Sequence, residues 1–323
     1  MGKMRIEIIN PENRKEYDEV ALQFGTVFNT SKWLAIFDNI LIYGIYDEGG
    51  NLIGGFYLYR EKRFGITIYR NPPFTPFIGP FIKNEAKNAA KIANKNREIL
   101  SLIAEYLDEF KHSIISASLG RNIIDTLPFI WRNYKAIAGY TYIIDLNYSI
   151  EELYKTISAE KRNDINRAKN DNAIVKRISD FSIVKSLVLK TFSRQEKNIN
   201  EKYLDKIIFE FANEKNSFAF ATYIENKPVS SVFCVFDRET AYYLLGGYDH
   251  ESKHRGAGVI AMWEAIKHSK NIGLRFFDFE GSMVPQIERY FRNFGGNLTP
   301  YFRISKAYLP LEIALKFFKR ELF

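Results

Sequence analysis

Two acidic residues alternate with two phenylalanines in the stretch Phe277–Gly281, and this spacing suggests chemistry. Alternate side chains of a β-strand share one face, so the phenylalanines would enter a core while Asp278 and Glu280 point together toward a cleft. A carboxylate placed there can take a proton from a reacting group. The same acids could instead only secure the turn by bonding to backbone amides. We expect the glycine to end the strand and Ser282 to cap a helix that opens near Pro285.

A glycine-rich stretch between residues 246 and 258 carries the second set of candidate residues. Its last glycines come directly before a helical pattern, and backbone N–H groups at a helix N-terminus attract anions together with the helix dipole. Lysine and arginine in the same stretch add charge, which suits a pyrophosphate or a nucleic-acid phosphate. A flexible loop beside a helix start is the simpler alternative. The residues expected to hold the anion are Gly246, Gly247, Lys253, Arg255, Gly256, Ala257 and Gly258.

Alternating strand and helix patterns must position these residues, which predicts an α/β fold with mixed sheets. In the second half, Ser149 and Glu152 form a capping box that opens a helix expected to run to about Asn170. Strands are expected at 41–46, 52–59, 65–69, 113–117, 140–146, 173–177, 218–224, 229–236, 241–245, 275–279 and 301–305. Helices are expected at 31–39, 85–110, 181–192, 201–214, 258–270, 284–294 and 310–321.

The chain of 323 residues is long enough for two domains of about 150 residues each. The two halves echo one another: each has a strand and a helical stretch, then a three-strand meander, then a loop rich in glycine or proline. We interpret this pattern as a duplication of one α/β unit, with domains at 1–147 and 148–323. Both sets of candidate residues then lie in the second domain.

Composition and charge narrow the class of protein. Basic residues outnumber acidic ones and give a net charge of +8, which favours an anionic partner such as a nucleotide-linked substrate; a solvated basic surface is the plainer explanation. The one cysteine, Cys234, lies in an apolar run, so we expect it in a core and no disulfide within the chain. No signal-peptide pattern or apolar run of membrane-spanning length is found, which predicts a cytoplasmic protein without an integral membrane segment.

Several motifs that occur in order along the chain resemble those of one known family. They are Asn71-Pro72-Pro73, Gly79-Pro80, Leu127-Pro128-Phe129, Tyr243-Leu244-Leu245-Gly246-Gly247, Gly256-Ala257, Trp263-Glu264-Ala265-Ile266, Phe277–Met283, Ile287-Glu288 and Phe291–Gly296. Together they resemble the tandem-GNAT acyltransferases related to the Fem-type, or methicillin-resistance-like, aminoacyltransferases of peptidoglycan bridges. The resemblance covers nearly the whole chain. It implies two tandem GNAT-like domains, of which the C-terminal one holds the donor and the catalytic site.

The resemblance also implies a reaction in which an acyl or aminoacyl group moves from an activated donor to an amine of a peptidoglycan or cell-envelope precursor. The donor is a substrate, either acyl-CoA or aminoacyl-tRNA, and no tightly bound cofactor is implied. Asp278 and Glu280 are then the candidate catalytic residues. Lys306 is similar to a lysine that Fem enzymes place near the transferring group, and a basic helix face with Arg162 could follow a tRNA backbone. The residues expected to contact substrate are Tyr243, Arg292, Lys306 and Arg162.

Two other functions stay open at this point. A non-catalytic binding protein could keep the same fold after its transferase site has decayed. The string His250-Glu251-Ser252-Lys253-His254 matches the zinc-peptidase pattern H-E-x-x-H, which requires both histidines on one face of a continuous helix. The glycines on either side of the string predict no such helix, so a zinc peptidase is the remoter alternative.

Overall fold

The chain divides into two compact units. The computed structural model describes residues 3–111, 113–196, 198–252, 254–281 and 283–318. One unit consists of Met1–Gly139 with Pro300–Phe323, and the other of Tyr140–Thr299. The expected division into 1–147 and 148–323 differs from this one because residues 300–323 return to the first unit. There the last strand pairs with an earlier one, in register from Arg303 opposite Ser118 to Ala307 opposite Ile114.

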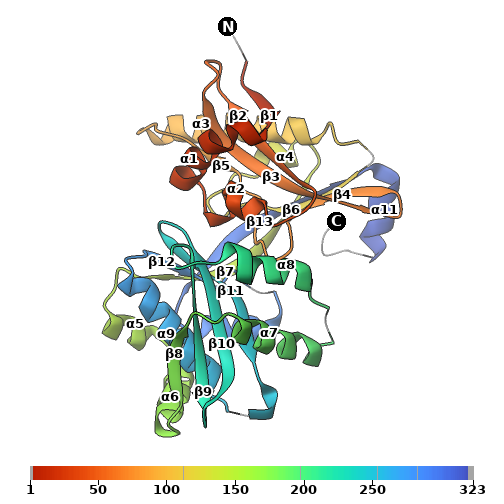
Figure 1. The fold of residues 1–323 in the computed structure, drawn as a ribbon. Helices are drawn as coiled ribbons and strands as arrows, with labels where there is room; N and C mark the ends of the chain where they lie inside the picture. The colour runs from red at the N-terminus through yellow and green to blue at the C-terminus, as the bar shows by residue number, and fades with distance from the viewer. Residues whose placement is uncertain (1–2, 112, 197, 253, 282, 319–323) are drawn as a thin grey trace. The chain divides into compact units, whose positions relative to one another are not determined.

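The first unit is built on a mixed sheet with strand order β1-β2-β3-β4-β6-β13, and β5 pairs with β3 (Figure 1). Its strands are β1 (Arg5–Ile8), β2 (Ile40–Tyr46), β3 (Leu52–Arg63), β4 (Ile66–Arg70), β5 (Phe81–Ile82), β6 (Ser113–Ser118) and β13 (Asn297–Ala307). Its α-helices are α1 (Arg14–Phe24), α2 (Ser31–Leu34), α3 (Ala89–Leu107), α4 (Leu127–Ile130) and α11 (Leu309–Phe318). None of the described helices is long and apolar enough to cross a membrane.

Helix α2 is shorter than the helix expected at 31–39. Thr30 caps it by accepting a hydrogen bond from the backbone N–H of Trp33, and the helix ends at Leu34. The chain then turns, and the adjacent side chains of Ile36 and Phe37 are both buried. A turn can bury both neighbours where a further helical turn would separate them on the helix surface.

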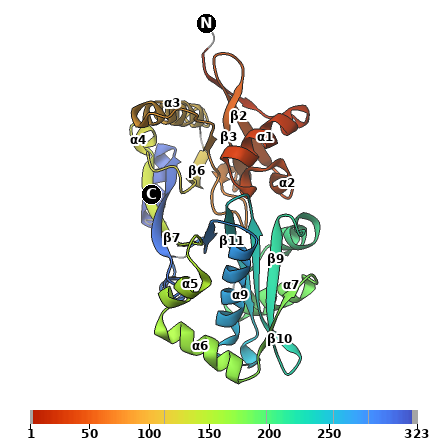
Figure 2. The same ribbon diagram turned by 90° about the vertical axis from the view of Figure 1, so that its left-hand side faces the viewer.

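The second unit is built on strands in the order β7-β12-β11-β10-β9-β8, with helices on both faces (Figures 1 and 2). Its strands are β7 (Lys135–Asp145), β8 (Ile174–Ile178), β9 (Ser217–Ile224), β10 (Lys227–Phe236), β11 (Thr240–Tyr248) and β12 (Phe276–Asp278). Its α-helices are α5 (Ile150–Thr156), α6 (Ala159–Asn170), α7 (Ser182–Arg194), α8 (Glu201–Asp205), α9 (Ala257–Asn271) and α10 (Pro285–Arg292). Helix α7 packs on β10 and β11, and α9 packs on β9 and β10 from the other side.

The helix expected from Ser149 to about Asn170 is in fact two helices. The capping box of Ser149 and Glu152 is confirmed and starts α5. Ile157 then adopts an extended conformation, and the side chain of Ser158 caps α6 by accepting from the N–H of Lys161. A second serine that can satisfy free backbone N–H groups makes the break favourable.

The helix expected at 201–214 is also interrupted. It is an α-helix only as far as Asp205, and Lys206–Phe211 continues with the wider turn of a π-helix. Such single π-turns are uncommon and are frequent at functional sites.

A large apolar core fills the side of the second sheet that faces α9. Phe277 and Phe279 are both within it, 0% and 1% exposed, and their rings are 5.1 Å apart. The expectation that these phenylalanines enter a core is confirmed. Their burial anchors the end of β12 and therefore the acids that alternate with them.

Candidate active site

The parallel strands β11 and β12 stop pairing at the acidic stretch. Their pairing runs from Thr240 opposite Phe276 to Tyr242 opposite Asp278, and β12 then ends. Glu280 and Gly281 both adopt the left-handed conformation, with φ of 58° and 72°. The strand expected at 275–279 is therefore shorter, and the chain turns away from β11 where the two acids sit.

Gly281 is required for this turn. A Cβ atom at this position would lie 2.1 Å from the carbonyl oxygen of Tyr140 on β7 and 3.0 Å from the Cα atom of Thr141. The turn therefore runs directly against the backbone of β7. Glycine satisfies both the positive φ and the close approach.

Asp278 holds the turn together from inside. Its side chain is buried, with 3% exposure. Oδ1 accepts a 2.6 Å hydrogen bond from Oγ1 of Thr141 and a 2.8 Å bond from the backbone N–H of Glu280. The alternative in which an acid secures the turn therefore describes Asp278, and the two acids do not share one strand face as expected.

Glu280 is placed differently. Its Oε1 atom is closed to solvent and has no hydrogen-bond partner within the described residues, although the residue as a whole is half-buried. Burial, and then the neighbouring charge of Asp278, raise the pKa of Glu280 well above its usual value. A shielded carboxyl group with a raised pKa is a candidate for proton transfer.

The thiol of Cys234 lies close enough to this carboxyl group for their charges to interact. Burial, and then the charge of Glu280, raise the pKa of the Cys234 thiol, so this free, buried cysteine is a core residue as expected. Burial, and then Cys234, raise the pKa of Tyr243. Its hydroxyl lies over Gly246, within 1.7 Å of where a Cβ atom would be. Tyr243 and Gly246, both on β11, therefore lie against one another.

The glycines of the predicted anion site have packing roles. A Cβ atom at Gly256 would lie 2.2 Å from the carbonyl oxygen of Asp164 on α6, and one at Gly247 would lie 2.5 Å from Cβ of Leu187 on α7. Both glycines thus allow a helix to approach the sheet or α9 closely. At Gly258, in contrast, the nearest atom is the hydroxyl oxygen of Tyr290, 3.8 Å away.

The cations near this site form ion pairs with two acids of α6. Nη2 of Arg255 lies 2.7 Å from Oε1 of Glu160, and its Nε lies 3.0 Å from Oδ1 of the buried Asp164. Nζ of Lys161 lies 3.6 Å from Oδ2 of Asp164 and 4.7 Å from the ring centre of Tyr290. Lys253 lies outside the described residues, as does Ser282. The cluster beside the first turn of α9 therefore holds three cations, Arg255, Lys161 and Arg289, and two carboxylates, Glu160 and Asp164.

Sequence reasoning did not single out the groups that cover the start of α9, namely Asp164 and Tyr290. Asp164 follows Lys161 by three residues, a helical spacing that hints at a pair. Nothing local in the sequence shows that this pair meets Arg255, because that contact joins different helices and loops.

The other residues expected to contact substrate form hydrogen bonds or ion pairs with neighbouring residues. Nη1 of Arg162 donates to the carbonyl oxygens of Lys155 and Ile157 at 3.0 and 2.8 Å and so caps the end of α5. Arg292 is largely exposed, with its Nε 3.5 Å from Oε1 of Glu288. The structure thus keeps Arg292 available at the surface, while it uses Arg162 in part to hold the two helices together.

Lys306 belongs to the first unit. Its Nζ donates to Oδ1 of Asp108 at 2.6 Å and to the carbonyl oxygen of Arg132 at 2.8 Å, and it lies 4.7 Å from the ring centre of Tyr134. These contacts anchor the end of β13 in its own unit.

The zinc-peptidase string does not form the helix it needs. His250–Ser252 is a short 3-10 helix, and His250 contacts the guanidinium of Arg194. Nε2 of His254 lies 3.2 Å from Oδ2 of Asp171 instead. The described residues contain no group of three or more metal-ligating side chains.

Comparisons with known proteins agree with this architecture. Residues 191–292 match the acetyltransferase (GNAT) domain family. The structure of FemX is 13% identical, with a TM-score of 0.69, and the match covers 97% of this chain and 99% of that chain. No curated protein matches the sequence.

Two further solved structures share the fold. The C-terminal domain of a putative lysylphosphatidylglycerol synthetase from Agrobacterium fabrum is 10% identical, with a TM-score of 0.61 over 95% of this chain and 96% of that one. A tandem GNAT protein from the clavulanic acid biosynthesis pathway is 9% identical, with a TM-score of 0.55 over 94% of this chain and 98% of that one. The chain therefore shares its fold with FemX and with a tandem GNAT protein, and its matched GNAT segment lies in the second unit.

Proposed function

We propose that the protein transfers an acyl or aminoacyl group from an activated donor to an amine, with Glu280 as the group that moves the proton. The observation that carries this proposal is the carboxyl oxygen of Glu280, shielded and unpaired within the described chain, at the point where β11 and β12 separate. The match of residues 191–292 to a GNAT domain supports the class of reaction.

The nitrogen of a neutral amine attacks the donor carbonyl carbon, a C–N bond forms, and the bond from that carbon to the leaving oxygen or sulfur breaks. The amine proton passes to the carboxylate of Glu280, which then returns a proton to the leaving group. A raised pKa makes Glu280 a stronger base than an ordinary carboxylate, which this step requires.

Asp278 acts in this proposal as a positioning residue. Its carboxylate is occupied by the Thr141 hydroxyl and by the backbone N–H of Glu280. It therefore holds the left-handed turn that presents Glu280, and its charge helps to raise the pKa of Glu280. The pair of candidate catalytic acids is thereby assigned two different tasks.

The net charge of +8 favours an aminoacyl ester on a polyanionic carrier, as in aminoacyl-tRNA, over acyl-CoA. The fold similarity to FemX supports a cell-envelope precursor as acceptor. The free thiol of Cys234 fits a reducing, cytoplasmic site of action.

A transfer assay with both donors tests the proposal. Purified protein is incubated with labelled aminoacyl-tRNA or acetyl-CoA and a panel of amine acceptors, including a peptidoglycan stem peptide. The variant Glu280→Gln should reduce the rate at least about 100-fold. Glu225→Gln, in an exposed turn of the same unit, is the matched control and should transfer normally.

Two outcomes would count against the proposal in different ways. Full activity of Glu280→Gln would remove Glu280 as the proton-transfer group. Absence of transfer with either donor, together with unchanged melting temperature in the presence of both, would favour the non-catalytic binding protein. Transfer from acetyl-CoA alone would overturn the preference for an aminoacyl ester.

A further inference from the structure

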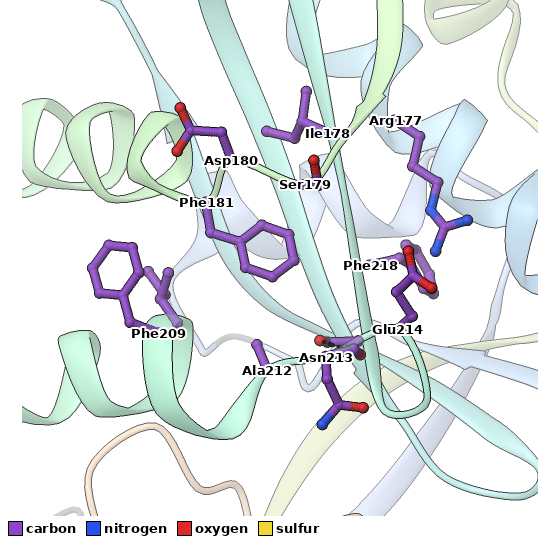
Figure 3. Close-up of a pocket in the computed structure, with 12 residues that line it drawn as sticks. Arg177, Ile178, Ser179, Asp180, Phe181, Phe209, Ala212, Asn213, Glu214 and Phe218 are labelled. Carbon is purple, nitrogen blue, oxygen red and sulfur yellow. Dashed lines mark hydrogen bonds between the residues drawn. The ribbon is translucent and has the colours of Figure 1, made fainter.

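A pocket of about 530 Å³ lies in the second unit, on segments that the proposed chemistry does not use (Figure 3). It is formed by the end of β8, the start of α7, the end of the π-helix and the start of β9. None of its lining residues belongs to β11, β12, α9 or α10. Its volume falls in the range of small-molecule sites.

One side of the pocket is aromatic. Figure 3 shows the rings of Phe181 and Phe209 on this side. Phe181 is held by an edge-on contact with Phe233, with ring centres 5.4 Å apart. Phe209 stands on the π-helix and is 53% exposed. The two rings offer apolar surface that a ligand could cover.

The other side carries one cation and one anion, Arg177 and Glu214 (Figure 3). Both residues are exposed, and no side-chain hydrogen bond or ion pair joins either of them to a residue that the structure describes. Burial, and then the charge of Arg177, lower the pKa of His268. Asp180, a third charged residue of the lining, is instead occupied, because its Oδ1 accepts from the backbone N–H of Ser182 at the start of α7. The unpartnered charges are therefore one positive and one negative group.

The loop that carries Glu214 is held in place. Nδ2 of Asn213 and Nδ2 of Asn216 both donate to the carbonyl oxygen of Phe211, at 3.1 and 3.0 Å. The backbone N–H of Asn213 donates in turn to Oδ1 of Asn216 at 2.9 Å. A pocket wall that is ordered before binding loses little entropy when a ligand enters.

We propose that this pocket binds an α-amino acid with a large apolar side chain. The carboxylate of the ligand pairs with the guanidinium of Arg177, where planar, two-point hydrogen bonding is available. Its ammonium group pairs with Glu214, and its side chain packs against Phe181 and Phe209. The site goes beyond the transfer reaction and does not depend on Glu280.

Isothermal titration with L-phenylalanine, without donor or acceptor, tests the site on the intact protein. Saturable binding is expected, and both N-acetyl-L-phenylalanine, which lacks the ammonium group, and L-phenylalaninamide, which lacks the carboxylate, should bind about 10- to 100-fold more weakly. L-Alanine should also bind weakly because it cannot cover the rings. Equal binding of the N-acetyl compound, or no saturable binding of L-phenylalanine, would overturn the proposal.

Substitution of one charged residue at a time tests the two proposed contacts separately. Arg177→Gln should weaken L-phenylalanine about tenfold or more while it leaves L-phenylalaninamide nearly unchanged, and Glu214→Gln should show the converse pattern with the N-acetyl compound. Arg238→Gln, an exposed arginine paired with Glu239, is the matched control and should bind normally. Loss of binding in the control, or an identical loss for all ligands in both variants, would contradict charge recognition. The titration measures binding without a transfer step. A negative result would therefore count against the pocket proposal and not against the proposed reaction.

Discussion

The backbone N–H of Glu280 donates a 2.8 Å hydrogen bond to Oδ1 of Asp278, so one acid of the stretch builds the turn that presents the other. The same oxygen accepts from Thr141, which lies 137 positions earlier in the chain. Asp278 therefore fixes Glu280 to β7 rather than to its own strand. The two acids are therefore expected to differ in their effects on protein stability as well as in their chemical roles.

Replacements of the two acids should have different effects on the free energy of unfolding. Asp278→Ala removes a buried acceptor of two hydrogen bonds, and we expect it to lower the free energy of unfolding by about 2–4 kcal/mol. Glu280→Gln replaces a shielded, unpaired carboxyl group and should leave stability equal or higher. Urea unfolding of both variants measures this difference. Similar losses in both would show that Glu280 also has a structural partner.

The raised pKa of Glu280 predicts how stability depends on pH. In the unfolded chain this carboxyl group titrates at its ordinary pKa, so between that value and the raised pKa the folded protein binds more protons. The free energy of unfolding should therefore fall as pH rises through this window. Above the raised pKa this carboxyl group should cause no further fall. Glu280→Gln lacks this effect, so its stability relative to wild type should increase with pH. Urea titrations of both proteins from acidic to alkaline pH check the sign.

The same titration predicts the pH dependence of transfer. The proposed reaction needs the carboxylate form of Glu280, so kcat/KM should rise with pH through the raised pKa. Asp278→Asn removes the neighbouring charge that contributes to the shift and should move this rise to lower pH. A rate profile that begins to rise at the ordinary carboxyl pKa in wild type would contradict the assignment.

Two left-handed glycines offer a matched test of the turn. At Gly281, φ is 72° and a Cβ atom would meet the Tyr140 carbonyl oxygen at 2.1 Å, whereas at Gly273 φ is 85° and nothing lies within 4 Å. Gly281→Ala should cost about 3 kcal/mol or more, and Gly273→Ala about 1 kcal/mol. Thermal and urea unfolding compare the two. Equal costs would mean that the turn does not press against β7.

Glycine substitutions can show whether the glycine-rich turn serves packing or anion binding. Gly256→Ala places a methyl group 2.2 Å from the Asp164 carbonyl oxygen and should destabilise the protein by about 1–3 kcal/mol. Gly258→Ala meets nothing closer than 3.8 Å inside α9 and should be neutral or stabilising by up to about 1 kcal/mol. A stable Gly256→Ala variant that loses only donor binding would restore the anion-site interpretation.

Lys306 can be compared with its own partner. Lys306→Gln loses the ion pair with Asp108 and the bond to the Arg132 carbonyl oxygen, and we expect a loss of about 1–2 kcal/mol in unfolding free energy. Asp108→Asn weakens the same cluster without removing the lysine. If Lys306 also contacts substrate, as the family resemblance implies, KM should rise in Lys306→Gln and stay near wild type in Asp108→Asn. Equal KM values would leave Lys306 with a structural role.

Local patterns in the sequence were sufficient for much of the fold. Alternating apolar residues and short turns indicated β2, β9 and β10 close to their observed bounds, whereas β3 continues past the expected end at Tyr59 to Arg63. The capping box at Ser149 started α5 as expected, because a cap depends on residues only three positions apart. The break at Ser158 used the same local chemistry, but a continuous pattern of buried residues hid it.

Contacts between distant segments set the roles of the candidate residues. Alternation predicted the burial of Phe277 and Phe279, since side-chain period is a property of the strand alone. Whether Asp278 or Glu280 would be free depended on Tyr140 and Thr141 of β7, and the ion pairs of Arg255 depended on Glu160 and Asp164 of α6. Residue types and spacing carry information about neighbours in the chain, whereas a pKa or an available charge depends on every group that folding brings within a few ångströms.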